Sequence, residues 1–337
     1  MSGVAKVSVV IPVYNIAAHL EECLDSVVGQ SLTDLEILCV DDGSTDESPD
    51  ILRAYEERDE RVRVLTQPNA GPGEARNRGL AAATGEYLIF LDSDDRFEEK
   101  FLERMVCRAE ETGGDTVICR SVEFDTHSGA ERPSDWMVKT HLTPGDVFSP
   151  EEAADTLFQF TYGWPWDKLY RTDFIRKNGL RFPPLRNSED LVFVFSALAC
   201  SERIALLPEV LVHHRVNRRA SVSNSRHLNP EMLYRAVCLF REELERREKY
   251  ERYRRSFLNW AMSFLVWNVA NMGEKGVQKR YFAKLKREYF PEMGFHRHPA
   301  DYYWNKVEYG KYLLVKYAPY PVFSLVLSVY HFLKKMR

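Results

Sequence analysis

Two alternating periodicities run through the first 120 residues and constrain the fold more than any other feature of the sequence. The runs KVSVVIPV (6–13) and LEILCVD (35–41) are short, apolar and β-branched, as buried strands are. Between them, apolar residues recur at helical spacing, at Leu20, Cys23, Leu24, Val27 and Val28. Strands separated by helices of this length form a mostly parallel sheet with helices on both faces. The sequence therefore predicts an α/β fold.

The same strand and helix pattern continues along the chain. Further strands are expected at 61–67, 86–92 and 115–122, and helices at 72–84 and 98–112. Residues 123–145 are polar with few apolar anchors, which predicts a loop or insertion. Beyond them we expect a capped helix at 149–160, a helix at 189–200, two short apolar runs at 203–208 and 210–216, and helices after Asn229. A domain boundary is expected near residue 225.

Polar clusters interrupt this pattern where the predicted strands end. They are PVYN (12–15), DDGSTDES (41–48), NAGPGEARN (69–77) and DSDD (92–95). Parallel strands place their carboxyl ends at one edge of a sheet, and α/β proteins bind ligands there. We therefore expect these clusters to surround one site.

The DSDD cluster contains three carboxylates within four positions: Asp92, Asp94 and Asp95. Like charges this close repel one another, so a cation is expected beside them. A DxD pair can hold a divalent cation that bridges two phosphates. Arg96 and Phe97 do not fit the spacing of a haloacid-dehalogenase-type phosphatase or an EF-hand. The structural alternative, acids that complement a helix N-terminus, explains one or two of the three.

The other clusters suit a nucleotide. Asp41 or Asp42 can accept a hydrogen bond from the imide N–H of uracil, and Tyr14 can lie against a base. The Gly-rich turn before Arg76 and Arg78 suits a phosphate. Taken singly, each cluster also has an ordinary explanation as a polar turn, a strand end or solvated arginines.

Composition excludes several other classes of protein. The 337 residues are 45% hydrophobic, enough for a sizeable core, and the formal charge of −4 gives no basic field for nucleic acid. Six scattered cysteines without a CxxC pair indicate buried thiols in a reducing cytosol. The N-terminus has no signal-peptide pattern, and no stretch reaches the ~20 apolar residues of a spanning helix.

Five segments together resemble the family 2 inverting glycosyltransferases of the GT-A fold, over about residues 6–220. They are VSVVIPVYN, ILCVDDGSTDES, GPGEARNRGLAAATGEYLIFLDSDD, WDKLYR and NSEDLVFVF. The resemblance implies a GT-A-like, Rossmann-related domain over residues 1–225, followed by a mainly helical region over 226–337. Within the first domain, residues 1–120 are the expected nucleotide-sugar half and 121–225 the acceptor half.

The resemblance also implies roles for individual residues. The expected nucleotide-binding set is Pro12, Tyr14, Asn15, Asp41, Asp42, Arg76, Asp92 and Ser93. Asp92 and Asp94 match the DxD that meets Mn²⁺ or Mg²⁺, with His213 as a further candidate ligand. In NSED, Asp190 matches the catalytic base and Glu189 its acidic neighbour, although a capped helix start would look the same.

A further set is expected on the acceptor or phosphate side: Asp95, Trp164, Trp166, Asp167, Lys168 and Arg215. Aromatic planes stack well on sugars, although the two tryptophans suit a core equally well. In the segment HHRVNRRASVSNS, His214 is the alternative metal ligand and Arg218 the alternative phosphate clamp. A pair of surface histidines at a strand end is the structural explanation.

The C-terminal segment 320–337 is expected to form a helix. Its polar stripe is narrow, at Ser324, Ser328, His331 and Lys335, and the segment ends in basic residues. Such a helix suits a membrane interface with anionic lipid. Packing on the protein body or in a homodimer seam is the alternative.

The sequence therefore predicts a metal-dependent inverting glycosyltransferase that uses a nucleotide sugar, most simply UDP-linked, with Asp190 as general base. The acceptor is expected to be a saccharide or a lipid-linked saccharide, for polysaccharide synthesis at the cell envelope. The location is expected to be cytoplasmic, on the inner membrane face. The alternatives are a sugar nucleotidyltransferase and an inactive sugar-nucleotide-binding scaffold. The donor sugar and the linkage do not follow from the sequence.

Overall fold

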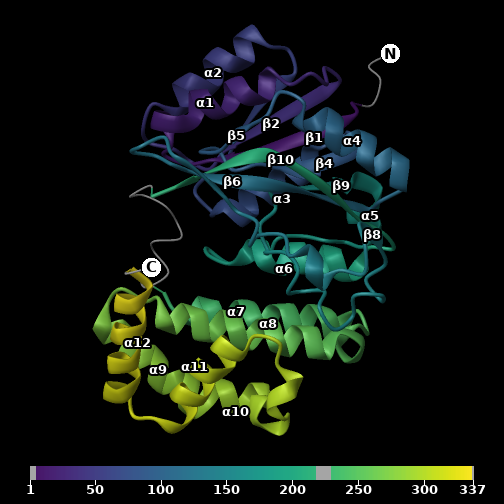
Figure 1. Ribbon diagram of the computed structural model, residues 1–337. Helices are drawn as coiled ribbons and strands as arrows, with labels where there is room; N and C mark the ends of the chain where they lie inside the picture. Colours follow the sequence, from purple (N-terminus) through teal and green to yellow (C-terminus); the bar gives the residue numbers. More distant parts are fainter. Residues whose placement is uncertain (1–4, 218–228, 336–337) are drawn as a thin grey trace. The chain divides into compact units, whose positions relative to one another are not determined.

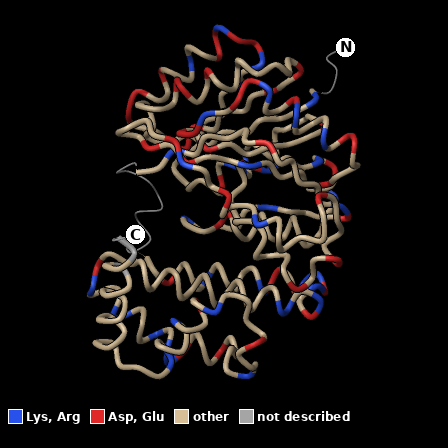
Figure 2. The backbone as a smooth tube through the Cα atoms, viewed as in Figure 1, with Lys and Arg blue, Asp and Glu red and all other residues tan. Residues whose placement is uncertain are grey.

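The fold is known from a computed structural model, which describes residues 5–217 and 229–335. The chain separates into two compact units, Met1–Arg219 and Ala220–Arg337 (Figure 1). Acidic and basic residues are interspersed along both units (Figure 2). All six cysteines are free, as predicted; three of them are buried and the other three are half-buried.

A ten-stranded sheet forms the centre of the first unit. Its strands are β1 (Val7–Val13), β2 (Leu35–Asp41), β3 (Val62–Thr66), β4 (Tyr87–Phe90), β5 (Arg96–Phe97), β6 (Thr116–Asp125), β7 (Glu131–Pro133), β8 (Val147–Phe148), β9 (Lys168–Arg171) and β10 (Ile204–Val216). The main order is β3-β2-β1-β4-β9-β6-β10-β5, with β7 beside β6 and β8 beside β10. The first four strands of this order are parallel, and antiparallel pairs begin at β9. The α/β class is confirmed, with a mixed sheet.

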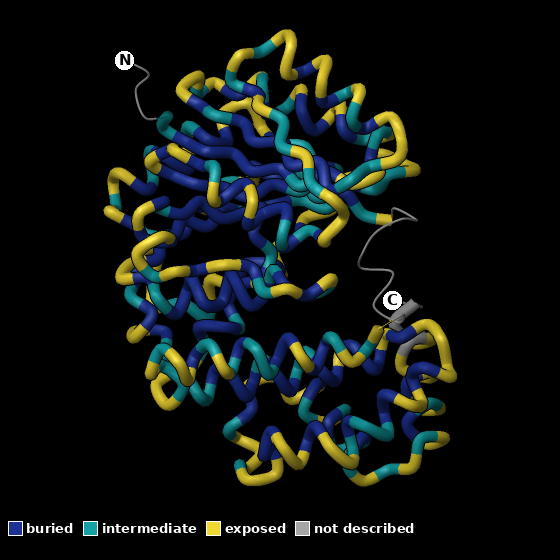
Figure 3. Tube along the Cα trace, turned by 180° about the vertical axis from the view of Figure 1, so that it is seen from behind, coloured by how far each residue is buried: buried dark blue, intermediate teal, exposed yellow. Residues whose placement is uncertain are grey.

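Helices cover both faces of this sheet (Figure 1). They are α1 (Ala17–Val28), α2 (Ser48–Arg58), α3 (Pro72–Ala82), α4 (Phe101–Thr112), α5 (Thr172–Lys177) and α6 (Glu189–Cys200). One apolar cluster joins α1, α2 and α4 to alternate residues of β1 and β2. Side chains on the opposite face of the sheet pack against α3 and α6. Val10 of β1 lies against Gly79 of α3, and the ring of Phe90 in β4 lies 5.3 Å from the ring of Phe193 in α6. The central strands are consequently buried on both sides (Figure 3).

Three expected elements differ from the structure. Residues 151–159 form turns and not the predicted capped helix. The two apolar runs at 203–208 and 210–216 are one strand, β10, whose pairing with β6 shifts register around Val210. Residues 123–145 are not simply a loop, because β6 extends to Asp125, β7 follows, and a 3₁₀ turn spans Thr140–Leu142.

The second unit is helical, as expected. Its longer helices are α7 (Glu231–Arg246), α8 (Tyr250–Ala270), α9 (Lys275–Lys284), α11 (Lys306–Tyr317) and α12 (Tyr320–Lys335). Between α9 and α11 lie a π-helical turn (Leu285–Tyr289), α10 (Phe290–Met293) and 3₁₀ turns at Phe295–Arg297 and Ala300–Tyr302. Apolar residues of α7 and α8 pack together, with the rings of Phe240 and Phe257 5.7 Å apart. No helix in the described residues is long and apolar enough to cross a membrane.

Candidate active site

Two of the polar clusters lie where the order of the strands reverses. β1 and β4 are parallel neighbours, with β2 and β3 on the far side of β1 and β9 on the far side of β4. Tyr14 and Asn15 directly follow β1, and Asp92 lies two residues beyond β4. A reversal of this kind is the usual ligand-binding position in α/β sheets.

The end of β1 is tied to the loop that follows β2. Asn15 adopts a left-handed backbone (φ 48°), and its Oδ1 accepts a hydrogen bond from the Thr45 backbone N–H at 2.7 Å. Its own N–H donates to Ser44 Oγ at 3.1 Å. Pro12 is half-buried within β1, whereas Tyr14 is 50% exposed. An aromatic ring therefore lies open to solvent at this edge of the sheet, as the nucleoside prediction requires.

Asp42 does not have the environment expected of a base-binding residue. It is buried, and one of its oxygens accepts hydrogen bonds from Gln67 Nε2 and Ala70 N, while the other accepts from Gly71 N, each at 2.8 Å. Asp41 is also buried and accepts a bond from its own turn. The Asp42 carboxylate therefore fixes the Gly-rich loop before α3, and its contact with a base stays a prediction. Gln67 was missed because nothing in its sequence context marks it.

The four residues of DSDD alternate between buried and partly exposed. Ser93 and Asp95 are buried, with Asp95 entirely inaccessible, whereas Asp92 and Asp94 are partly exposed. The tight turn after β4 thus presents two of the three carboxylates at the surface. The third has an internal role.

Asp95 fixes the end of β10. Each of its carboxylate oxygens lies 3.1 Å from His214 Nδ1, and Oδ1 also accepts the Arg215 backbone N–H at 2.8 Å. Burial disfavours a charge on His214, but the facing Asp95 carboxylate, with Asp92 and Asp94 nearby, outweighs it and raises the pKa of His214 to about 9. The buried ion pair between His214 and Asp95 therefore offsets part of the repulsion among the DSDD carboxylates.

The other two candidates on β10 have different contacts. His213 Nε2 lies 2.7 Å from Glu98, and its Nδ1 lies 2.9 Å from Glu131. The structure thus does not bring His213 together with Asp92 and Asp94, because neighbouring strand residues face opposite ways. Arg215 donates to the Asp94 carbonyl at 2.7 Å and pairs with Glu22 of α1. Arg218 lies outside the described residues.

Arg76 joins the two acidic motifs. Its side chain is 7% exposed; Nη2 lies 2.8 Å from Asp92 Oδ1, and Nη1 lies 2.9 Å from Glu189 Oε1. The sequence predicted Arg76 as a phosphate ligand. It gave no sign of this bridge, because Asp92 lies 16 positions and Glu189 lies 113 positions from Arg76 in the chain. A planar guanidinium suits the role because it can bind two carboxylates at fixed angles. The end of β4 and the start of α6 are therefore held side by side.

Glu189 and Asp190 begin α6. Ser188 precedes them in a left-handed conformation (φ 64°), and its side chain makes no cap to the helix backbone. Burial and the adjacent Asp190 raise the pKa of Glu189 to about 7, although Arg76 acts against the shift. Asp190 is less buried, and its Oδ1 accepts the Leu191 N–H at 2.8 Å. Two neighbouring carboxyls thus occupy different environments, which is how proton-transfer sites separate their groups.

Five of the six residues expected on the acceptor or phosphate side are buried: Asp95, Trp166, Asp167, Lys168 and Arg215. Lys168 Nζ lies 2.6 Å from Asp167 Oδ1 and donates to the Trp164 carbonyl at 2.9 Å. In this structure these five side chains are packed inside the protein, so direct contact with an acceptor is not seen in their environment. Trp164 is partly exposed and remains a candidate for contact with the acceptor.

The DSDD turn has the donor set of a phosphate-bridging cation. No group of three or more His, Cys, Asp or Glu residues is arranged to hold a metal within residues 5–217 and 229–335. Mg²⁺ is commonly held by one or two carboxylates and completed by substrate phosphates and water. Asp92 and Asp94, both partly exposed oxygen donors, fit that arrangement.

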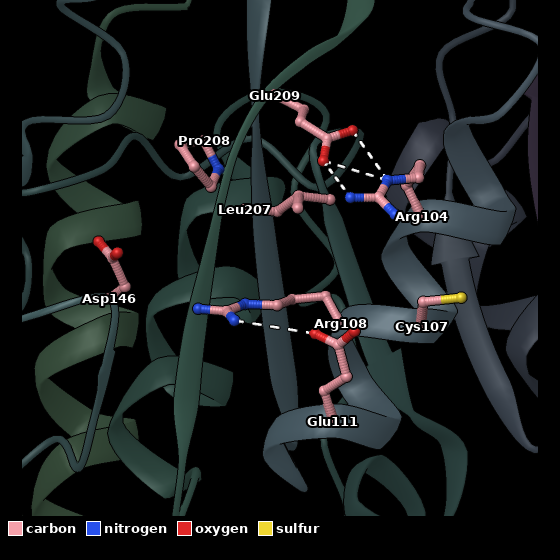
Figure 4. Close-up of a pocket in the computed structure, with 8 residues that line it drawn as sticks. All are labelled: Arg104, Cys107, Arg108, Glu111, Asp146, Leu207, Pro208 and Glu209. Carbon is pink, nitrogen blue, oxygen red and sulfur yellow. Dashed lines mark hydrogen bonds and ion pairs between the residues drawn. The ribbon is translucent and has the colours of Figure 1, made fainter.

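A pocket of about 250 Å³ lies elsewhere in the first unit, between α4 and β10 (Figure 4). Arg104 forms a paired contact with Glu209 there, and Arg108 reaches Glu111. None of its lining residues belongs to the predicted site.

A sequence model described as "Glycosyl transferase family 2" matches residues 8–179, which is 172 of the 337 residues. The chain belongs to glycosyl transferase family 2. The matched range includes the β1, β2 and β4 clusters and Arg76, and ends before α6. Glu189 and Asp190 are therefore linked to the family 2 motifs by the contact of Arg76 and by the resemblance already described.

Individual family 2 proteins match most of the chain. EpsH of Bacillus subtilis (strain 168) is 32% identical over 289 residues, covering 83% of this chain and 81% of EpsH. The uncharacterized glycosyltransferase YibD of Escherichia coli (strain K12) is 30% identical over 253 residues, 73% of each chain. A crystal structure of S. aureus TarS 1–349 in complex with UDP-GlcNAc superposes with a TM-score of 0.68 at 24% identity, covering 92% of this chain and 90% of that one. The protein is a glycosyltransferase, and its fold is the one TarS has.

Proposed function

We propose that this glycosyltransferase moves a sugar from a UDP-sugar, with inversion, to a hydroxyl of a saccharide or lipid-linked saccharide. The observation that carries the proposal is the Arg76 bridge. One guanidinium contacts both Asp92 and Glu189, so the DSDD turn and the start of α6 are neighbours. Inverting transfer needs a diphosphate-binding group and a base on the other side of the reacting carbon. Family membership favours this reaction over the nucleotidyltransferase alternative.

The donor is proposed to bind at the ends of β1 and β4. Tyr14 offers an exposed ring to the base, and the loop fixed by Asn15 borders the same edge. The complex of TarS with UDP-GlcNAc supports a uridine nucleotide, because the two folds match over 92% of this chain. The identity of the transferred sugar depends on the shapes of loops that the β1 and β4 clusters do not define.

Asp190 is proposed as the general base. It must accept a proton from the incoming hydroxyl, which requires an accessible, ionised carboxylate. Asp190 is the more exposed of the two acids. Glu189 is buried and bound to Arg76, so it positions the start of α6.

Asp92 and Asp94 are proposed to hold Mn²⁺ or Mg²⁺ together with the donor diphosphate. Such a cation supplies positive charge that stabilises the leaving diphosphate. Arg76 holds one Asp92 oxygen in place from inside the protein. The partly exposed Asp94 completes the pair at the surface.

Donor binding tests the proposed function. With Mn²⁺ present, UDP-sugars at 100 times their Kd should stabilise the protein by ~2.7 kcal/mol, seen as a higher melting temperature. GDP- and dTDP-sugars should give smaller shifts, and EDTA or Asp94→Asn should reduce the shift with UDP-sugars. Asp50→Asn, on the exposed start of α2, is the matched control. An unchanged melting temperature with all three classes of donor would contradict the proposal.

We also propose that α12 lies at the surface of an anionic membrane on the cytoplasmic side. One face of α12 packs inward, with the Phe323 ring 5.0 Å from Phe282 of α9. The other face is exposed and apolar, at Val322, Leu325, Val326, Val329, Tyr330, Phe332 and Leu333. Lys311, which pairs with Glu308 at 2.7 Å, lies 5.0 Å from the Tyr330 ring beside this face, and the basic residues that end the sequence supply the charge for anionic lipid. The side chains of His331 and Lys335, predicted in its polar stripe, are outside the described set.

Vesicle sedimentation tests this membrane contact. The protein should pellet with vesicles containing phosphatidylglycerol and stay in solution with phosphatidylcholine alone, because both apolar and charged groups contribute. Leu325→Glu with Phe332→Glu should reduce the pelleted fraction about tenfold or more. Val210→Glu, an exposed apolar position of the first unit, is the control. A lipid-independent dimer that the α12 substitutions dissociate would instead show that this face binds a second copy.

A further inference from the structure

An exposed tryptophan lies in a segment that is otherwise firmly held. Trp136 is 41% exposed, whereas its neighbours Met137 and Val138 are 2% and 5% exposed. Val138 pairs with Thr161, and Ser134 bonds with Ser121 of β6. The segment 134–138 is therefore anchored on both sides of its exposed ring. Because the backbone is fixed, the exposed ring of Trp136 and the neighbouring exposed ring of Tyr162 form a preformed aromatic surface.

Trp136 stands at the end of a column of rings. Tyr162 stacks on Trp164 at 5.0 Å, and Trp164 stacks on Trp166 at 5.5 Å. Trp136 meets Tyr162 and Trp164 nearly at right angles, at 5.0 and 5.9 Å. Within the part of the chain that the structure describes, no ring lies parallel to Trp136. Its ring is thus held by its neighbours without being covered by a stacked aromatic.

At one end, the column of rings contacts His214, which is bound to the DSDD turn. His214 stacks on Trp166 at 4.8 Å and on Trp164 at 5.8 Å. The same histidine is paired with Asp95, next to the DxD residue Asp94. The exposed ring is therefore connected to the proposed diphosphate site through a rigid series of contacts.

A second contact connects the column to the proposed base. Gly163 lies so close to the start of α6 that an added Cβ would be 2.5 Å from Leu191 Cβ and 2.6 Å from its Cα. Leu191 directly follows Asp190. The segment 162–164 consequently packs on the first turn of α6. The ring column therefore contacts the first turn of α6 through Gly163 and the partner of Asp95 through Trp164 and Trp166.

We propose that Trp136, with Tyr162 beside it, is the stacking surface for the acceptor saccharide. This inference rests on the proposed function, and it assigns the acceptor site to residues other than the buried Trp166. An acceptor must present its hydroxyl near Asp190, and the column packs on Leu191, the residue that directly follows Asp190. A pyranose has one face of C–H groups, which packs on an aromatic plane while the hydroxyls remain hydrated. The ligand class is therefore a neutral or weakly charged sugar ring.

Binding to a printed array of bacterial oligosaccharides tests the inference, with the protein saturated with UDP and Mn²⁺. For the glycan that the wild type binds best, Trp136→Ala should raise Kd about tenfold, because one aromatic contact is lost. Trp136→Phe retains a ring and should stay within about threefold of the wild type. Trp267→Ala, at an exposed tryptophan of α8, is the matched control and should not change Kd. The Kd for UDP should be unchanged in all three variants.

Two outcomes would overturn the inference while the proposed function stands. One is that Trp136→Ala binds glycans as tightly as the wild type. The other is that the wild type binds UDP with Mn²⁺ but none of the arrayed glycans. Failure of the wild type to bind UDP would refute the proposed function, and the inference with it.

Discussion

Replacing Asp190 with asparagine is expected to lower kcat by about 10²- to 10⁴-fold, the usual contribution of a general base. The amide has nearly the shape of the carboxylate but cannot accept the proton of the acceptor hydroxyl. Donor affinity should change by less than about twofold, because the proposed diphosphate ligands Asp92 and Asp94 are unaltered. Single-turnover transfer from a UDP-sugar and calorimetric titration with UDP and Mn²⁺ measure the two quantities separately.

Asp173→Asn is a matched control for this experiment. Asp173 also lies in the first turn of a helix, α5, and is exposed. If the role of Asp190 were only to complement the helix dipole, the two variants would lose similar small amounts of stability, about 0.3 to 1 kcal/mol, and both would keep activity. Full turnover in Asp190→Asn would remove this residue from the proposed mechanism.

The pH dependence of the wild type follows from the same pair of acids. Glu189 has a pKa of about 7 because of burial and the charge on Asp190. A proton on Glu189 removes a negative charge from beside Asp190 and weakens the ion pair with Arg76, so Asp190 attracts the proton of the hydroxyl less strongly. We expect kcat/KM to fall as the pH is lowered through 7.

The elements that could be predicted from sequence are those whose partners are close in the chain. The helix at 189–200 was predicted to the residue, because a continuous apolar run follows two acids that favour a helix N-terminus. The strands predicted at 6–13 and 35–41 correspond to β1 and β2, and they were found because both are buried on two faces and mostly apolar. In contrast, Pro208 and Glu209 divide the apolar pattern of β10, so one strand looked like two.

The site was predictable as a set of motifs but not as a set of contacts. The clusters at β1 and β4 were expected at one sheet edge, and the strand order places them there. Which carboxylate faces solvent depends on distant partners: Asp95 is turned inward by His214, 119 positions away. Trp136 lies in a polar segment whose anchors became visible only in the pairing with Thr161.

Removing the Arg76 charge by Arg76→Met is expected to destabilise the first unit by about 3 to 5 kcal/mol, the usual cost of leaving a buried charge without its partner. The corresponding fall in melting temperature is about 6 to 20 °C for a unit of this size. Glu189 would remain buried without the cation that favours its ionised form, so its pKa should rise further above 7. A carboxyl with a raised native pKa stabilises the fold at low pH and loses that contribution as the pH rises through the pKa. The loss of stability caused by Arg76→Met should therefore be larger at pH 8.5 than at pH 5.5.

Two further variants separate the charge from the packing. Arg78→Met, on the exposed face of the same helix, removes an identical side chain and should change the melting temperature by no more than about 2 °C. Adding Glu189→Gln to Arg76→Met replaces the unpaired acid by a neutral amide and should restore part of the stability at pH 8.5 but little at pH 5.5, where Glu189 is already protonated. Equal destabilisation by Arg76→Met at both pH values, with no recovery in the double variant, would mean that Arg76 acts through its hydrophobic stem. The bridge between the DxD turn and α6 would then have no electrostatic basis.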